Sequence, residues 1–161
     1  MSTQVVQDLK NALGDELERL STELMSRLHA AQESSHDAPA ADRTTLQERI
    51  RFLGALLAAL PGVDSAHVLR GRVGLGSTVR VRDLMSERTE SFAIVPSELA
   101  DGTPTLVTPG SPVGQAVLGG RKGDVVEVTT PARVRKIRVE RVQTVWDTLE
   151  AWRRGDVSAV V

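Results

Sequence analysis

The fold of the first part of this chain is set by the stretch Leu46-Gln-Glu-Arg-Ile-Arg-Phe-Leu-Gly-Ala-Leu-Leu-Ala-Ala-Leu60. Branched apolar residues recur in it at intervals of four and three, which places them along one side of an α-helix. They are Leu46, Ile50, Leu53, Leu57 and Leu60. Pro61-Gly62 follows at once and ends the helix. The stretch therefore predicts an amphipathic helix over residues 39–60.

The residues before this stretch predict a further helix. Leucine recurs there at the same alternating intervals, so a second apolar stripe follows one helix face. The leucines are Leu9, Leu13, Leu17, Leu20, Leu24 and Leu28. We place the turn at residues 34–38, because Pro39 fits the first turn of a helix but not its middle. Residues 1–62 are therefore predicted to form an antiparallel coiled-coil helical hairpin.

From Val68 onward the spacing of apolar residues changes from helical to alternating. The run Ser77-Thr-Val-Arg-Val-Arg82 places Val79 and Val81 on one face of a strand. Further strands are predicted at residues 92–95, 105–108, 124–129 and 136–140, with glycines between them. Residues 63–161 are therefore predicted to form a small β-sheet domain, and the whole chain an α+β fold.

One short helix and a tail complete this second domain. Ser111 can cap a helix that begins at Pro112 and ends before Gly119. Beyond the sheet, three large apolar residues recur at every third position, as on one face of a helix. They are Trp146, Leu149 and Trp152. We expect this C-terminal tail extension to pack on the protein's own surface.

Composition excludes several classes of protein. The 161 residues carry 20 basic and 21 acidic side chains, a net charge of −1, which does not suit a strongly basic nucleic-acid binder. Cysteine is absent, so disulfides and thiolate metal sites are excluded. No apolar run approaches the roughly 18 residues of a membrane span, and residues 1–10 do not read as a secretory signal. We therefore expect a cytoplasmic protein without membrane contact.

The residues suggest little chemistry of the chain's own. The three histidines are isolated from one another in the sequence, so we expect no metal site, no cofactor and no enzyme. Three acids, Glu33, Asp37 and Asp42, cluster around the predicted turn. Converging carboxylates could hold a magnesium ion in a site that a partner completes. They could equally be solvated acids near a helix terminus.

A basic run lies in the last predicted strand and before it. Its members are Arg133, Arg135, Lys136, Arg138 and Arg141. Because the basic residues alternate with Ile137 and Val139, they favour a solvated or protein-binding strand face over a nucleic-acid site. The alternation slips at Arg141-Val142, which predicts a bulge or the strand end. We expect no sequence-specific binding of nucleic acid.

Three segments of the second domain resemble the C-terminal domain of the bacterial GreA/GreB transcription factors. They are Val73-Gly-Leu-Gly-Ser-Thr-Val79, Ser111-Pro-Val-Gly-Gln-Ala-Val-Leu-Gly119 and Lys122-Gly-Asp-Val-Val-Glu-Val128. Their order and spacing agree with the family from Val73 to Val142. The resemblance implies an FKBP-like sheet that docks on RNA polymerase at the rim of its secondary channel. The positions that match the docking segment are Ser111, Pro112, Val113 and Gln115.

The resemblance also implies that the hairpin enters this channel toward the polymerase active centre. In cleavage-active members the tip reads Asp-x-x-Glu-Asn followed by an aromatic residue, and its acids help to hold a second magnesium ion. Here the segment reads Ser35-His-Asp-Ala-Pro-Ala-Ala-Asp42, so Asp37 matches the first acid but Ala40 replaces the glutamate. This departure favours a non-cleaving member of the family.

Three hypotheses follow. The first is a monomeric transcription regulator that binds RNA polymerase through its C-terminal domain and inserts its hairpin into the secondary channel, modulating or inhibiting RNA synthesis. The alternative is a Gre-type factor that stimulates cleavage of backtracked RNA by the polymerase, with Asp37 and either Glu33 or Asp42 as magnesium ligands. The third is a prolyl-isomerase-like module, which we disfavour because Phe92 is the only aromatic residue of the second domain before Val142.

Overall fold

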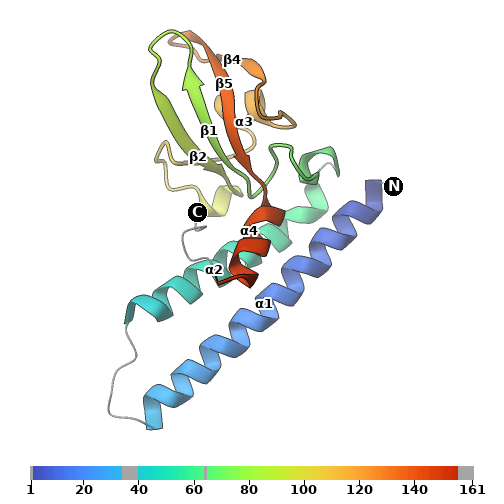
Figure 1. The fold of residues 1–161 in the computed structure, drawn as a ribbon, viewed down its shortest axis with the longest axis vertical. Helices are drawn as coiled ribbons and strands as arrows, with labels where there is room; N and C mark the ends of the chain where they lie inside the picture. The colour runs from blue at the N-terminus through green and yellow to red at the C-terminus, as the bar shows by residue number, and fades with distance from the viewer. Residues whose placement is uncertain (1, 34–39, 64, 156–161) are drawn as a thin grey trace.

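The computed structural model describes residues 2–33, 40–63 and 65–155. Two long antiparallel helices, α1 (Ser2–Glu33) and α2 (Ala40–Ala59), lie along one side of the molecule (Figure 1). A five-stranded sheet follows, formed by β1 (Thr78–Asp83), β2 (Thr89–Ile94), β3 (Leu106–Val107), β4 (Val125–Thr129) and β5 (Val134–Gln143). Two further helices are α3 (Pro112–Val117) and α4 (Val145–Arg153). Three short 3₁₀ segments lie at Leu60–Gly62, Ser65–Val68 and Ser97–Leu99. The predicted α+β fold is thus confirmed.

The helical hairpin forms where the leucine spacing predicted it. Leu9, Leu13 and Leu20 of α1 are buried, and α2 ends at Ala59, one residue before the predicted end. Pro61 lies in a short 3₁₀ turn whose tighter winding replaces the α-helix. The predicted turn at residues 34–38 lies outside the described residues. Of the described helices, none is both long and apolar enough to span a membrane.

The apolar stripe of α2 is rotated from the predicted one. Ile50 and Leu57 are only half-buried, whereas Phe52 and Leu56 are buried. The prediction assumed that α2 contacts one helix, but α2 packs against α1 on one side and beneath α4 and the sheet domain on the other. A helix covered from two directions buries a wider face than a simple coiled-coil seam does. Its buried positions therefore include residues outside the stripe.

The sheet has the strand order β3-β2-β1-β5-β4. All neighbours are antiparallel except β2 and β3, which run parallel. The register of β1 and β5 shifts between Arg80, which lies opposite Arg141, and Val81, which lies opposite Val139. Glu140 is therefore the extra residue of a β-bulge, next to the slip that the sequence predicted. Its carboxylate accepts a hydrogen bond from Arg82 Nε at 2.6 Å.

The turn after β1 is organised by a buried carboxylate. Asp83 accepts hydrogen bonds from the backbone N–H groups of Met85 at 2.9 Å and Ser86 at 3.1 Å. These two bonds, followed by the charge of Arg135, hold the pKa of the Asp83 carboxyl below its ordinary value. The ionised side chain thus fixes the connection between β1 and β2, where Glu87 adopts a positive φ of 59°.

The C-terminal helix α4 joins the hairpin to the sheet domain. Thr144 and Asp147 form a capping box at its start, with Thr144 N donating to Asp147 Oδ2 at 2.9 Å. Trp152, only 3% exposed, meets Phe52 of α2 in an edge-to-face contact with the ring centroids 6.2 Å apart. Trp146 Nε1 donates to the carbonyl of Val68 at 2.9 Å. The expectation that the tail packs on the protein's own surface is met by these contacts.

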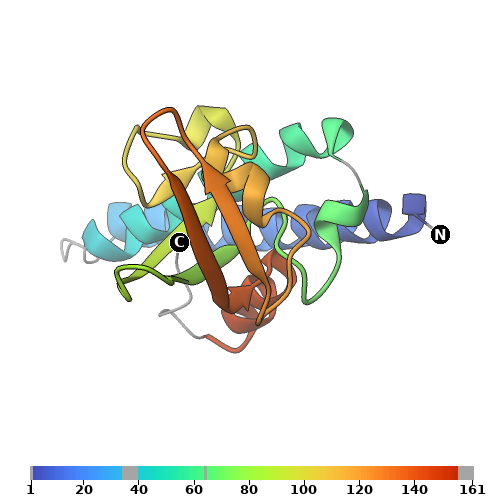
Figure 2. The same ribbon diagram turned by 90° about the horizontal axis from the view of Figure 1, so that it is seen from above.

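One contiguous hydrophobic core runs through the hairpin, the sheet and α4. Seen from above, the sheet lies over part of the hairpin, and the N-terminal end of α1 extends beyond it (Figure 2). The division of the chain at residues 1–62 and 63–161 stays a prediction, because the apolar contacts continue across it.

Candidate functional site

The short helix α3 begins with a well-formed cap. Ser111 Oγ accepts a hydrogen bond from the N–H of Gly114 at 3.1 Å and donates one to the carbonyl of Thr108 at 2.8 Å. Pro112 occupies the first helical turn, where a backbone N–H would have no partner within the helix, so proline's lack of this group costs nothing. The two bonds of one hydroxyl thus join the helix start to the loop before it and fix the direction of α3.

The four candidate docking residues present a surface without charge. Pro112 and Gln115 are exposed, and Ser111 and Val113 are half-buried. Val117, which is fully buried, anchors the helix from its other side. Such a surface carries no charged side chain, and it offers a rigid corner with apolar and amide contacts to a protein partner.

Gly114 is required by the close approach of this helix to the preceding loop. A Cβ atom built on it would lie 2.2 Å from the carbonyl oxygen of Thr108 and 3.0 Å from Ser111 Oγ. Our sequence analysis did not single out Gly114. The sequence sign of this role is a glycine in the middle of a short helix, because glycine there normally destabilises the helix.

The second candidate group, the acids near the hairpin turn, lies far from α3. Glu33 is the last residue of α1, and Asp42 lies in the first turn of α2. Asp37 lies outside the described residues, as do the side chains of Glu33 and Asp42. The ends of α1 and α2 that flank the turn and helix α3 lie at opposite ends of the molecule (Figure 1). Docking and tip chemistry would therefore belong to separate parts of the chain.

Within the part of the chain that the structure describes, no three His, Asp or Glu side chains gather as a metal site would need.

The residues of the basic run have different environments. Arg135 is largely buried and lies 3.7 Å from Asp83 and 3.3 Å from Glu90. Lys136 and Arg138 are exposed on β5, as their alternation with Ile137 and Val139 predicted.

Two polar positions of the hairpin, Glu16 and Arg49, are buried and were not predicted from the sequence. Arg49 of α2 is only 8% exposed, and its guanidinium carbon lies 4.8 Å from the centroid of the Trp152 ring. The signal lay in the spacing, because Arg49 stands three residues after Leu46 and four before Leu53, both of them buried. From the sequence alone, an arginine at such a position is expected at the surface, because the sequence does not show that α4 covers it.

Comparisons with known proteins agree on one family. The family model described as "Transcription elongation factor, GreA/GreB, C-term" matches residues 68–144. The transcription elongation factor GreA of Alkaliphilus oremlandii (strain OhILAs) is 33% identical over 141 residues, which cover 81% of this chain and 89% of that relative. GreA of Acetivibrio thermocellus is 28% identical over 140 residues, covering 87% of this chain and 88% of the relative.

Solved structures of similar proteins include a GreA factor homolog. The crystal structure of GreA factor homolog 1 (Gfh1) of Thermus thermophilus has 27% sequence identity to this chain. The alignment covers 83% of this chain and 93% of that one, with a TM-score of 0.40.

Proposed function

This chain belongs to the GreA/GreB family of transcription elongation factors, and we propose that it binds RNA polymerase through the α3 segment and places its helical hairpin in the polymerase secondary channel. There it modulates or inhibits RNA synthesis. Any cleavage of RNA would be catalysed by the polymerase and not by this chain. The proposed partner is a bacterial RNA polymerase, and the protein acts as a monomer.

The observation that carries the proposal is the geometry of α3. The matched region, residues 68–144, contains the whole segment. Ser111 caps the start of α3, and Pro112 and Gln115 are exposed beside it. A surface whose backbone is fixed before binding loses little conformational entropy on contact, which favours affinity for a protein partner.

The dimensions of the hairpin support its role as an inserted arm. At about 1.5 Å per residue, the 32 residues of α1 span about 48 Å and the 20 residues of α2 about 30 Å. Two packed helices make a stiff rod, and because α4 and the sheet domain cover part of α2, the end of the hairpin toward the turn is the part that projects from the molecule (Figure 1). Such an arm suits a narrow channel better than a loop would.

Inhibition is favoured over cleavage by the residues around the turn. Ala40 begins α2 where cleavage-active members would carry a glutamate. An alanine methyl group cannot ligate magnesium, so Asp37 would have to act with Glu33 or Asp42 at a different spacing. A hairpin that occupies the channel without a second metal ligand would obstruct nucleotides instead of activating a water.

The docking assignment is tested by replacing its residues. We expect Ser111→Ala combined with Pro112→Ala to weaken binding to the cognate RNA polymerase at least about tenfold, since the helix start loses its cap and its fixed backbone. Gln115→Arg, at an exposed position outside the cap, should weaken binding similarly without lowering the thermal midpoint. Binding would be measured by gel filtration and biolayer interferometry.

Ser91→Ala serves as the matched control, because Ser91 is exposed on β2, outside the α3 segment. It should leave polymerase binding unchanged. If the Gln115→Arg protein, folded as judged by its thermal midpoint, bound the polymerase as tightly as the control did, the assignment of α3 as the docking segment would be wrong.

A further inference from the structure

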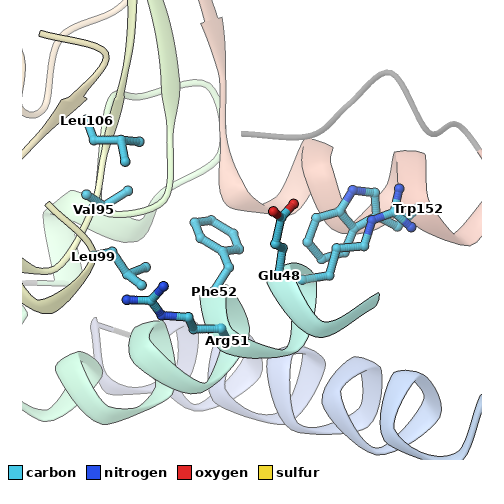
Figure 3. A pocket seen from close by; sticks show the side chains of 8 residues that line it. Glu48, Arg51, Phe52, Val95, Leu99, Leu106 and Trp152 are labelled. Atoms are coloured by element: carbon cyan, nitrogen blue, oxygen red, sulfur yellow. The ribbon is translucent and has the colours of Figure 1, made fainter. Parts of the chain in front are cut away.

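The two faces of the sheet have different surroundings. One face is covered by the rest of the protein, and its central residues are buried: Val79, Val81, Ile137 and Val139. Past the end of β2, Val95 and Leu99 also face the helices, across a cavity from Phe52 of α2 (Figure 3). Side chains alternate along a strand, so the residues between the buried ones point to the opposite face. There Arg80 and Arg138 are exposed, so the described chain leaves this face open.

This open face is strongly basic. The registers of β1, β4 and β5 place seven charged strand residues on it: Arg80, Arg82, Glu127, Lys136, Arg138, Glu140 and Arg141. Five of them are basic and two are acidic, so the face carries an excess of three positive charges. The whole chain has a net charge of −1. The positive charge of the open face is therefore a local feature and not a consequence of overall composition.

The β-bulge of β5 enlarges this basic face. With strict alternation Arg138 and Arg141, which are three residues apart, would lie on opposite faces of the strand. Glu140 is the extra residue, so Arg141 returns to the face of Arg138 and lies opposite Arg80 of β1. Arg138 lies opposite Arg82. The bulge thus gathers four arginines of two neighbouring strands on one face.

The arrangement brings like charges together. Cationic side chains directly opposite each other on neighbouring strands destabilise a sheet. Glu140 offsets part of this repulsion, because its carboxylate lies 2.6 Å from Arg82 Nε and 3.7 Å from Arg80 Nε. Among the described residues, no acid forms an ion pair with the other three basic residues of the face: Lys136, Arg138 and Arg141. An anionic partner would pair with these cations and relieve the repulsion.

A protein segment suits this face better than nucleic acid does. Val125 and Val134, each 51% exposed, lie on the open face beside the cations, with Val125 opposite Arg138. Apolar and arginine side chains together are typical of protein interfaces, whereas surfaces that bind nucleic acid are more polar. The strand residues of the open face include no aromatic ring on which a base could stack. Arginine also binds carboxylates through two parallel hydrogen bonds.

We propose that the open face of the sheet is a docking surface for an acidic segment of a protein partner. Its carboxylates pair with Lys136, Arg138 and Arg141, and its apolar side chains cover Val125 and Val134. Alternate residues of a strand are about 6.6 Å apart, so an extended segment with acids at every second position matches the spacing of Lys136 and Arg138. Because α3 packs on the covered face, this surface is separate from the segment proposed to dock on RNA polymerase.

Fluorescence anisotropy measures this docking directly. The probe is a labelled ten-residue peptide of alternating glutamate and threonine, titrated with the unsubstituted protein at about 20 mM salt, where surface charges are screened little. We expect saturable binding that weakens as the salt concentration rises. A peptide of alternating glutamine and threonine, which keeps the extended backbone without the charge, should bind at least about tenfold more weakly.

Two matched double variants separate the sheet face from the overall charge. Arg138→Gln with Arg141→Gln should weaken peptide binding at least about tenfold. It should not lower the thermal midpoint, since each substitution removes a cation that lies opposite another cation. Arg153→Gln with Arg154→Gln removes the same charge from the exposed end of α4, outside the sheet, and should leave binding unchanged.

Absence of saturable binding to the glutamate peptide would overturn the proposal. So would equal binding by the folded double variant of β5, which would show that the peptide binds elsewhere. A six-nucleotide RNA has five phosphodiesters, which match the five glutamates of the peptide. Tighter binding of this RNA than of the peptide, lost in the same variant, would show that the face binds nucleic acid instead. Polymerase is absent from these experiments, so their failure would leave the α3 docking proposal untouched.

Discussion

Replacing Trp152 by alanine is expected to lower the free energy of unfolding by about 3–5 kcal/mol, the usual cost of removing a buried aromatic side chain. The ring is 3% exposed, packs against Phe52 and lies under the guanidinium of Arg49. Its loss would leave a cavity where α4 joins the hairpin, and a stacked cation would lose its aromatic partner. Urea denaturation followed by circular dichroism measures the change.

The two tryptophans of α4 provide a matched comparison for this prediction. Trp146 is only half-buried, and it contributes one hydrogen bond to Val68 and a stacking contact with the exposed Arg70. Trp146→Ala should therefore cost less than Trp152→Ala. Equal costs for the two substitutions would show that Trp152 does not hold the hairpin to the sheet domain in the way that its burial indicates.

Gly114→Ala is expected to weaken RNA polymerase binding at least about tenfold, with a loss of stability confined to the α3 region. The new Cβ atom would meet the Thr108 carbonyl at 2.2 Å, so α3 must move away from the loop that precedes it. This movement would displace Pro112 and Gln115 from the positions that the cap of Ser111 gives them. Biolayer interferometry with the cognate polymerase would measure the affinity.

Gly110→Ala is the control for this prediction, because Gly110 lies in the same loop and no atom lies within 4 Å of the Cβ position it would gain. The Gly110 variant should bind like the unsubstituted protein. If Gly114→Ala bound equally well, while hydrogen exchange showed that α3 had shifted, the orientation of α3 would not matter for docking.

The sequence predicted those parts of the fold that depend on local signals. The Ser111-Pro112 start of α3 agrees with the structure, and Gly119 follows the helix with a positive φ of 77°. The β-bulge next to Arg141 was visible because the alternation of apolar and charged residues slips there. Caps, turns and bulges involve residues that are neighbours in the chain, so the sequence alone can predict them.

The rest could not be predicted, because it depends on contacts between distant segments. Trp152 meets Phe52, which precedes it by 100 residues, and no periodicity in either helix reveals this partner. The burial of Arg49 follows only once α4 is known to cover α2. Gly114 is likewise explained by the path of the Thr108 loop and not by its own helix. Sequence spacing shows which face of an element is apolar, but not which other elements cover that face.

We propose that this protein regulates RNA polymerase from within the secondary channel without promoting cleavage. The most direct test adds the purified protein to backtracked elongation complexes of the cognate polymerase and follows RNA length with and without nucleotides. We predict that RNA is not shortened, and that extension slows and recovers at high nucleotide concentration. Shortening of the RNA that disappears with Asp37→Asn would contradict this claim and identify a cleavage factor.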